Sequence, residues 1–377
     1  MNNIFIPVNE PLLDGNELKY LTECIKTGWI SSEGPFVKDF EQKFAHKVNR
    51  RYGIAVSNGS AALEIAVKAL DIGEGDEVIL PAFTIISCAA AIVKAGAKPV
   101  LVDTEPHTYN MNVNQIKEKI NARTKAIMVV HIYGLPVDMN PIIELAKSNK
   151  LKIIEDAAEM HGQTYYGEPC GSFGEVSTFS FYPNKHITTG EGGMIVTNNE
   201  VLAEKCRSLR NLGFLKEKRF IHEELGWNYR FTNLQAAVGL AQLEKLEDHI
   251  NRKHEIGNLY DELLSDLSKI ELPLPHTNYA QNIYWVYGIV IKEEVGMDAE
   301  EVMKKLKEKG IGTRPFFWPM HLQPVFNKMG MFLNEKYPVA ENLAIKGFYI
   351  PSGVGITNEQ IEFVSKQLKL LFTELAK

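Results

Sequence analysis

Residues 177–198 read Ser-Thr-Phe-Ser-Phe-Tyr-Pro-Asn-Lys-His-Ile-Thr-Thr-Gly-Glu-Gly-Gly-Met-Ile-Val-Thr-Asn. The β-branched and aromatic run from Val176 to Tyr182 predicts a buried strand, and Met194 to Thr197 predicts the strand that returns beside it. Lys185 lies between the two. Burial would lower the pKa of its amine and make that amine a better nucleophile toward a carbonyl. A solvated turn lysine is the alternative, but the surrounding glycines indicate close approach of the backbone to a bound group.

The composition is that of an ordinary globular protein. The chain has 377 residues, of which 45% are hydrophobic and 23% are charged, enough for one large and one small domain. Its net charge of −6, without a basic block, argues against nucleic acid as a partner. The four cysteines form no Cys-x-x-Cys pair, which argues against a structural zinc site and suits a reducing cytoplasm. No apolar run approaches the ~20 residues that cross a bilayer, so we expect a cytoplasmic protein without a membrane span.

Strands and helices alternate through the first part of the chain. This alternation predicts an α/β fold with a doubly wound, mainly parallel sheet, whose strands we expect at Tyr52–Val56, Asp76–Leu80, Pro99–Val102, Ala126–Val130 and Leu151–Glu155.

The pattern changes near residue 250. A long helix is expected from Leu234 to about Leu264, followed by a strand at Asn282–Ile291 and a helix at Tyr337–Phe348. These elements are typical of an α+β unit. We therefore expect a large α/β domain at residues 14–250 and a small domain at residues 251–377, against which residues 1–13 pack.

Two patterns outside the lysine stretch indicate ligand contacts. Ser57-Asn58-Gly59-Ser60 joins a strand to a helix, and a glycine turn at a helix start presents free N–H groups to an anion. No lysine follows in the Walker position, so this is not a P-loop. Asp156 follows a predicted strand at the sheet edge where ligands of α/β proteins collect, although a helix cap is the alternative. Ser180 is either a ligand contact or a satisfied core hydroxyl.

The segments Ser180-Phe-Tyr-Pro-Asn-Lys185 and Gly190-Glu-Gly-Gly193 match a family motif in register. The chain resembles the DegT/DnrJ/EryC1/StrS family of sugar aminotransferases, which use pyridoxal phosphate (PLP). The resemblance extends over nearly the whole chain and implies the aspartate aminotransferase fold (fold type I). It also implies that the cofactor alternates between PLP and pyridoxamine phosphate.

The resemblance assigns roles to single residues. Lys185 and Asp156 are the implied catalytic residues, with Asp156 against the ring nitrogen of the cofactor. The residue after Thr84 is often aromatic in the family and stacks on the ring; here it is Ile85, which we favour over Phe83 for this role. Asn228 is implied to reach the cofactor of a neighbouring subunit, so we expect a homodimer with shared active sites. The full implied cofactor set is Gly59, Ser60, Ile85, Asp156, Glu159, Ser180, Lys185 and Asn228.

Two further segments resemble GDP-perosamine synthases, a branch of this family. They are Gly28 to Ser32 and Arg314 to Pro324, and they imply substrate contacts by Trp29, Ser31, Arg314, Phe317 and His321. The implied reaction moves an amino group from L-glutamate to C4 of a nucleotide-linked 4-keto-6-deoxyhexose. GDP-4-keto-6-deoxymannose is the favoured substrate and GDP-perosamine the product. dTDP- or UDP-4-keto-6-deoxyglucose, amination at C3 and another amino donor are alternatives.

Two different functions remain as competing hypotheses. Sugar 3-dehydratases of the same family carry histidine in place of the lysine, but here His186 is one residue out of register. A non-catalytic sensor with this fold is the other hypothesis.

Overall fold

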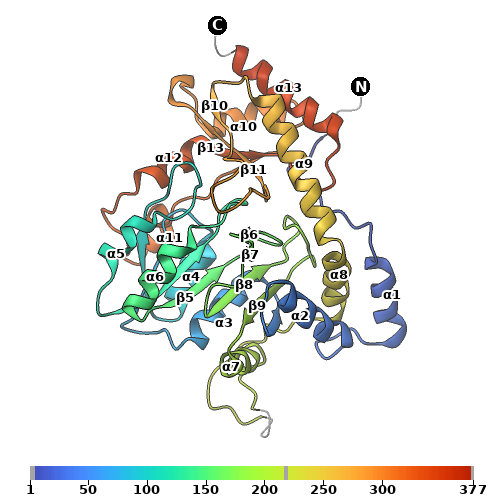
Figure 1. Cartoon of the computed structure of the whole chain (residues 1–377), viewed down its shortest axis with the longest axis vertical. Helices are drawn as coiled ribbons and strands as arrows, with labels where there is room; N and C mark the ends of the chain where they lie inside the picture. Colours follow the sequence, from blue (N-terminus) through green and yellow to red (C-terminus); the bar gives the residue numbers. More distant parts are fainter. Residues whose placement is uncertain (1–4, 216–219, 375–377) are drawn as a thin grey trace.

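A seven-stranded sheet forms the centre of the molecule (Figure 1). The structure, a computed structural model, describes residues 5–215 and 220–374. The strand order is β1-β9-β8-β5-β4-β2-β3, and β3, β2, β4, β5 and β8 run parallel while β9 is antiparallel to β8 and β1. The predicted mainly parallel sheet is therefore confirmed. The strands are β1 (Tyr52–Val56), β2 (Glu77–Pro81), β3 (Lys98–Val102), β4 (Thr124–Val130), β5 (Lys152–Asp156), β8 (Val176–Ser180) and β9 (Gly193–Thr197).

Helices cover both faces of this sheet because its central strands are apolar on both sides. On β4, Met128 packs in the cluster that contains α3 and α4, whereas Ile127 and Val129 pack against α6 on the opposite face. This two-sided burial is typical of parallel sheets. The helices around the sheet are α1 (Glu17–Thr27), α2 (Pro35–Lys47), α3 (Gly59–Ala69), α4 (Ile86–Lys94), α5 (Ile116–Lys119), α6 (Met139–Asn149), α7 (Glu200–Arg210) and α8 (Asn233–Glu244).

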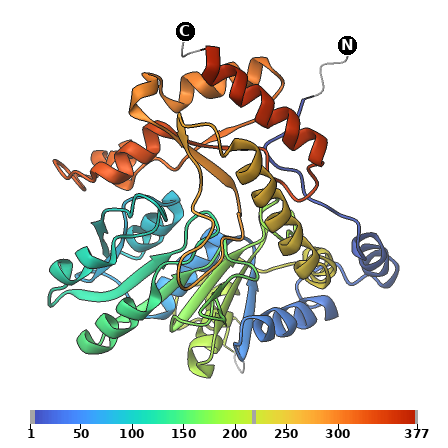
Figure 2. The same ribbon diagram turned by 45° about the horizontal axis from the view of Figure 1, so that its top comes forward.

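A second, antiparallel sheet lies above the first, in the order β10-β11-β13-β12 (Figures 1 and 2). Ile6, near the start of the chain, pairs with Ile311 and belongs to the hydrophobic cluster of this sheet. The elements here are β10 (Ile270–Glu271), β11 (Tyr287–Ile291), α10 (Ala299–Glu308), β12 (Arg314–Pro315), α11 (Pro324–Lys328), α12 (Pro338–Lys346), β13 (Gly347–Ile350) and α13 (Asn358–Glu374), with the hairpin β6 (Thr164–Tyr165) and β7 (Glu168–Pro169) nearer the first sheet.

Helix α9 (Leu246–Leu264) connects the two regions and runs along one side of the molecule toward α8 (Figure 1). Its first turns, at Leu246 and Ile250, pack with the aromatic cluster around α2 and α8. Its later turns, at Ile256 and Tyr260, pack with the second sheet. One helix therefore belongs to two hydrophobic clusters.

Some predicted elements end differently. The single helix expected from Leu234 to Leu264 is two helices, and the break at Lys245 carries no proline or glycine that would announce it. The helix expected at Tyr337–Phe348 stops at Lys346, and Gly347 starts β13. A Cβ at Gly347 would lie 2.1 Å from the Phe316 ring, so glycine permits this close packing. The strand expected from Asn282 begins only at Tyr287.

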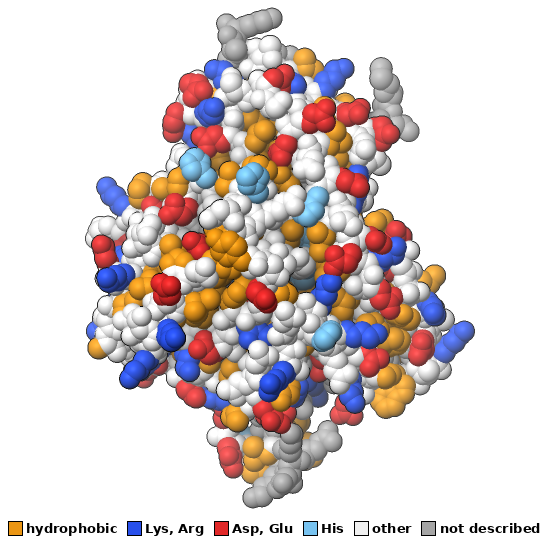
Figure 3. All heavy atoms as spheres, in the orientation of Figure 1, with side chains coloured by type: hydrophobic (Ala, Val, Ile, Leu, Met, Phe, Trp, Pro, Cys, Tyr) orange, Lys and Arg blue, Asp and Glu red, His pale blue; other side chains and the backbone are white. Residues whose placement is uncertain are grey.

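Acidic and basic side chains intermingle over the face shown in Figure 3. Among the described residues, no helix is both long and apolar enough to traverse a bilayer.

The end of β5 is fixed by a buried hydrogen-bond network around Glu155. The Glu155 carboxylate accepts hydrogen bonds from the N–H groups of Gly171, Phe173 and Gly174 at 2.5, 2.9 and 3.2 Å. The Ser177 hydroxyl donates to the same carboxylate at 2.9 Å. Burial would raise the pKa of Glu155, but the bonds from His131 and the backbone outweigh it and lower this pKa. The carboxylate is thus held charged inside the fold.

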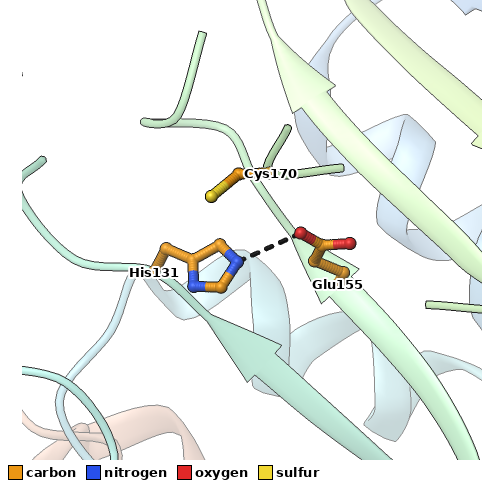
Figure 4. Close-up of side chains that lie close together, drawn as sticks. All are labelled: His131, Glu155 and Cys170. Atoms are coloured by element: carbon orange, nitrogen blue, oxygen red, sulfur yellow. Dashed lines mark hydrogen bonds and ion pairs between the residues drawn. The ribbon is translucent and has the colours of Figure 1, made fainter. Parts of the chain in front are cut away.

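Cys170 lies beside His131 and Glu155, and the three offer donor atoms within 4.8 Å of one another (Figure 4). His131 Nδ1 accepts from Val137 N at 3.0 Å, which leaves Nε2 to donate to Glu155 at 3.2 Å. Burial raises the pKa of the Cys170 thiol and keeps it protonated. Since the nitrogens and carboxylate oxygens already have partners, we interpret this group as a structural network rather than a metal site.

This network makes Glu155 important for stability. We expect Glu155→Gln to lower the free energy of unfolding by about 2–3 kcal/mol, because an amide leaves buried N–H donors unsatisfied. The loss should be visible as a lower denaturant midpoint at neutral pH. Because the folded pKa is depressed, the wild-type advantage is present above the unfolded carboxyl pKa of about 4.3 and disappears as pH falls through the folded value. Glu168→Gln, which removes an exposed carboxylate nearby, is the control and should change little. Equal midpoints for Glu155→Gln and the wild type would contradict this interpretation.

Candidate active site

A cavity of about 370 Å³ lies at the C-terminal ends of the parallel strands β4, β5 and β8. The starts of α3 and α4 line the cavity, as do Trp285, from the segment before β11, and Tyr349 of β13. This is the edge at which α/β folds bind ligands. The structure brings eight of the sequence-predicted residues to this cavity: Gly59, Ser60, Ile85, Asp156, Glu159, Ser180, Lys185 and Phe317.

One end of the cavity is built to hold an anion. Asn58 caps α3 by accepting a hydrogen bond from Ala61 N at 2.8 Å. The N–H groups of Gly59 and Ser60, in the first turn, have no intrahelical acceptor and carry the positive end of the helix dipole. A Cβ at Gly59 would lie 2.9 Å from Ser180 Cβ, so only glycine allows this approach. Ser87, from the first turn of α4, hydrogen bonds to the Ser60 hydroxyl at 2.7 Å. Backbone N–H groups and hydroxyls therefore converge on one point.

Lys185 also lines the cavity, and its side chain is only 10% exposed. Its Nζ lies 3.8 Å from Glu159 Oε1 and 3.9 Å from the centroid of the Trp285 ring. Burial lowers the pKa of Lys185, and the charges of Glu159 and Asp156 oppose this shift. Burial likewise raises the pKa of Glu159 to about 8, against the influence of Lys185 and of the Tyr133 N–H, which donates at 2.7 Å. Both shifts favour the neutral forms of the two side chains, and perturbed pKa values of this kind are common at functional sites.

Asp156 lines the same cavity and is almost fully buried. Its carboxylate accepts from Ala158 N at 3.1 Å and from the Cys88 thiol at 3.2 Å. Burial raises its pKa, and within residues 5–215 and 220–374 it forms no ion pair. A buried carboxyl group in a cavity fits a ligand that brings its own N–H cation. Nearby, the Thr178 hydroxyl lines the cavity without a hydrogen-bond partner among the described atoms.

These features fit the parts of PLP. The anion cradle at α3 suits a phosphate, Asp156 suits a protonated ring nitrogen, and the amine of Lys185 suits an aldehyde carbon. Ile85, at the N-cap of α4 and 43% exposed, lines the cavity. Phe83 is instead buried against Phe316 and Phe317. The geometry thus brings Ile85, rather than Phe83, beside the space where a ring would lie.

Five predicted residues lie outside the cavity. Asn228 is exposed and accepts from Arg230 Nε at 2.9 Å. Trp29 and Ser31 lie on the exposed loop before α2, where their carbonyl groups accept hydrogen bonds from Asn233. Arg314 is exposed on β12, and its guanidinium donates to the neighbouring carbonyl of Thr313.

The fifth, His321, is buried, and its ring lies 2.9 Å from Glu341 and packs on Tyr337. Its side chain is therefore engaged inside the fold rather than at the cavity. Within one chain, neither the predicted cofactor contact Asn228 nor the predicted substrate contacts Trp29, Ser31, Arg314 and His321 line the cavity.

Sequence reasoning missed several residues that line or support the cavity. Ser87 and Cys88 follow the end of β2, and their position at the C-terminal sheet edge could have indicated them. Trp285 comes from the segment before β11, a hundred residues after Lys185 in the sequence, and no local pattern marks it.

Comparison with known proteins gives a consistent result. The sequence profile of the DegT/DnrJ/EryC1/StrS aminotransferase family matches residues 11–369. GDP-perosamine synthase from Escherichia coli O157:H7 is 41% identical over 98% of this chain and 99% of its own length. GDP-perosamine synthase from Caulobacter vibrioides is 42% identical over 95% of this chain and 96% of its own.

Solved structures agree in fold. The aminotransferase TlmJ from Streptoalloteichus hindustanus superposes with a TM-score of 0.91 at 29% identity, covering 99% of this chain and 100% of TlmJ. DesV from S. venezuelae superposes with a TM-score of 0.90 at 30% identity, covering 98% and 99%. Since the profile, the relatives and these structures each span almost the whole chain, this protein belongs to the DegT/DnrJ/EryC1/StrS aminotransferase family and is a PLP-dependent aminotransferase of fold type I.

Proposed function

We propose that this protein transfers an amino group from L-glutamate to C4 of GDP-4-keto-6-deoxymannose and so forms GDP-perosamine. The observation that carries the proposal is the buried amine of Lys185, 3.8 Å from Glu159, in a cavity that is also lined by the start of α3, which can hold an anion. The choice of sugar is supported by three relatives, 39–42% identical over nearly their full length, that are named GDP-perosamine synthase.

Five cavity residues have proposed binding or catalytic roles in this reaction. PLP, when bound, supplies an electron-accepting ring that lets a carbon next to nitrogen lose its proton. Gly59, Ser60 and Ser180 would hold its phosphate, and Asp156 would keep its ring nitrogen protonated. Lys185 Nζ takes the proton from the α-carbon of the donor and gives it up again. Burial lowers the pKa of Lys185, which leaves more of its amine neutral and able to accept that proton.

We also propose that two copies of the chain share their active sites. Trp29, Ser31 and Asn228 are exposed and lie away from the cavity of their own chain, which supports a role in a partner's cavity. Exposed apolar side chains at Leu18 and Ile25 of α1 supply a surface for such contact. The reduced cysteines support a cytoplasmic location, and we place the domain boundary near residue 250.

A 4-aminotransferase for a dTDP-linked sugar is the second candidate. The dTDP-4-dehydro-2,3,6-trideoxy-D-glucose 4-aminotransferase of Saccharopolyspora spinosa is 29% identical over 97% of this chain. The dehydratase hypothesis is weaker, because His186 is buried and its Nε2 lies 3.4 Å from the carbonyl oxygen of Ile283, outside the cavity lining.

The substrate is tested by turnover with GDP-, dTDP- and UDP-4-keto-6-deoxyhexoses in parallel, each with PLP and glutamate. We expect kcat/KM for the GDP sugar to exceed the others by about tenfold or more, because base contacts discriminate by such factors. Mass and NMR of the product should locate the new nitrogen at C4. A preference for dTDP would support the second candidate, and loss of water without gain of nitrogen would reveal a dehydratase.

The role of Lys185 is tested by substitution. We expect Lys185→Ala to lower kcat by at least about a thousandfold, since it removes the group that moves the proton. Lys68→Ala is the matched control, because Lys68 is exposed on α3, which also forms the anion cradle. Wild-type turnover by Lys185→Ala would disprove the mechanism.

A further inference from the structure

The indole of Trp285 contacts the lysine loop twice, and the backbone of Trp285 is held by a third contact. Its ring centroid lies 3.9 Å from Lys185 Nζ. Its Nε1 donates to the carbonyl of Asn184 at 2.8 Å, one residue before Lys185. Its own carbonyl accepts from the buried Lys253 Nζ at 3.0 Å. Trp285 is only 4% exposed, so its indole is largely shielded from water.

Neighbouring aromatic rings hold the indole plane. Tyr133 and Tyr349 pack against it with centroids at 5.8 and 6.4 Å. The face of an indole carries negative electrostatic potential and attracts an ammonium group within about 6 Å, more strongly when water is excluded. Trp285 therefore presents an attractive surface to the charged form of the lysine and little to the neutral form.

The charged form needs such a partner. When Lys185 takes a proton it becomes an ammonium in a buried cavity, which burial disfavours. Glu159 compensates incompletely, since its pKa of about 8 leaves much of it protonated at neutral pH. An indole face does not titrate and acts equally at every pH. The titratable groups that face or influence Lys185 are Glu159, Asp156, Cys88, His161 and His186.

We propose that Trp285 is a further catalytic residue, whose ring face stabilises the ammonium form of Lys185 while the amine carries the proton. The bond from Nε1 to Asn184 fixes where the amine rests between taking the proton and releasing it. This inference rests on the proposed role of Lys185. It differs from a purely structural role, in which the indole would only form a wall of the cavity.

The direct test titrates Lys185 in the full-length enzyme in its pyridoxamine phosphate form, where the amine is free. Trace acetic anhydride acylates neutral amines, and mass spectrometry of the Lys185 peptide gives the labelling at each pH. We expect the midpoint for Trp285→Leu to fall by about half to one pH unit, because the charged form loses its partner. Trp285→Phe keeps a weaker aromatic face. Its labelling midpoint should therefore lie between the midpoints of Trp285→Leu and the wild type.

The control is Tyr287→Phe on β11, which loses a hydrogen bond to Asp261 of α9 but does not line the cavity. Its midpoint should equal that of the wild type. An unchanged midpoint in folded Trp285→Leu would overturn the proposal. If that variant does not fold, Trp285→Phe decides alone, and an unchanged midpoint again overturns it.

Kinetic measurements separate this role from a structural one. For Trp285→Leu, we expect the acidic limb of the kcat–pH profile to move to lower pH by as much as the labelling midpoint. We also expect kcat to be reduced by a larger factor than KM is raised. A raised KM with an unmoved limb would mean that Trp285 only shapes the sugar site. Labelling requires no sugar, so an enzyme inactive with every keto-sugar would refute the proposed function and leave the titration result standing.

Discussion

The alternation of side chains along β5 is the constraint on which the cavity depends. Glu155 and Asp156 are adjacent, so their carboxylates point to opposite faces of the sheet. The Glu155 carboxylate accepts hydrogen bonds from the backbone of residues 171–174, and these bonds hold the end of β5 in place. Asp156 is therefore presented to the cavity by a strand that cannot slide. A shift of one residue would exchange the two faces and remove the carboxylate from the site.

Much of the cavity was predictable because its parts lie at the ends of regular elements. Gly59, Asp156 and Ser180 each stand where a strand ends or a helix begins, and such positions can be read from hydrophobic runs and glycine turns. Their convergence follows from the parallel sheet, which collects C-terminal strand ends at one edge. The resemblance to a known family supplied the individual roles; the residues alone left Asp156 and Ser180 with ordinary structural alternatives.

The remainder depends on contacts between distant parts of the chain. Trp285 contacts Lys185 only because the second sheet lies over the first. A local sequence pattern cannot predict such a long-range contact. His321 lies in a segment that resembles a sugar-binding loop, yet Glu341 and Tyr337 engage its ring. β13 replaced the end of a predicted helix because pairing with β11 and β12 outweighs local preference at Gly347–Ile350. In each case tertiary packing, rather than propensity, decided the outcome.

The sharing of α9 between two hydrophobic clusters bears on how this protein changes over evolutionary time. The part of the chain that follows α9 also contributes Trp285, Phe316 and Tyr337 to the hydrophobic cluster around the central sheet. The region that carries the second sheet is therefore not an interchangeable module. A recombination event that joined the first part of this chain to the last part of a distant relative would have to preserve the packing on both sides of α9. We expect sugar preference in such enzymes to diversify through single substitutions in loops rather than through exchange of whole domains.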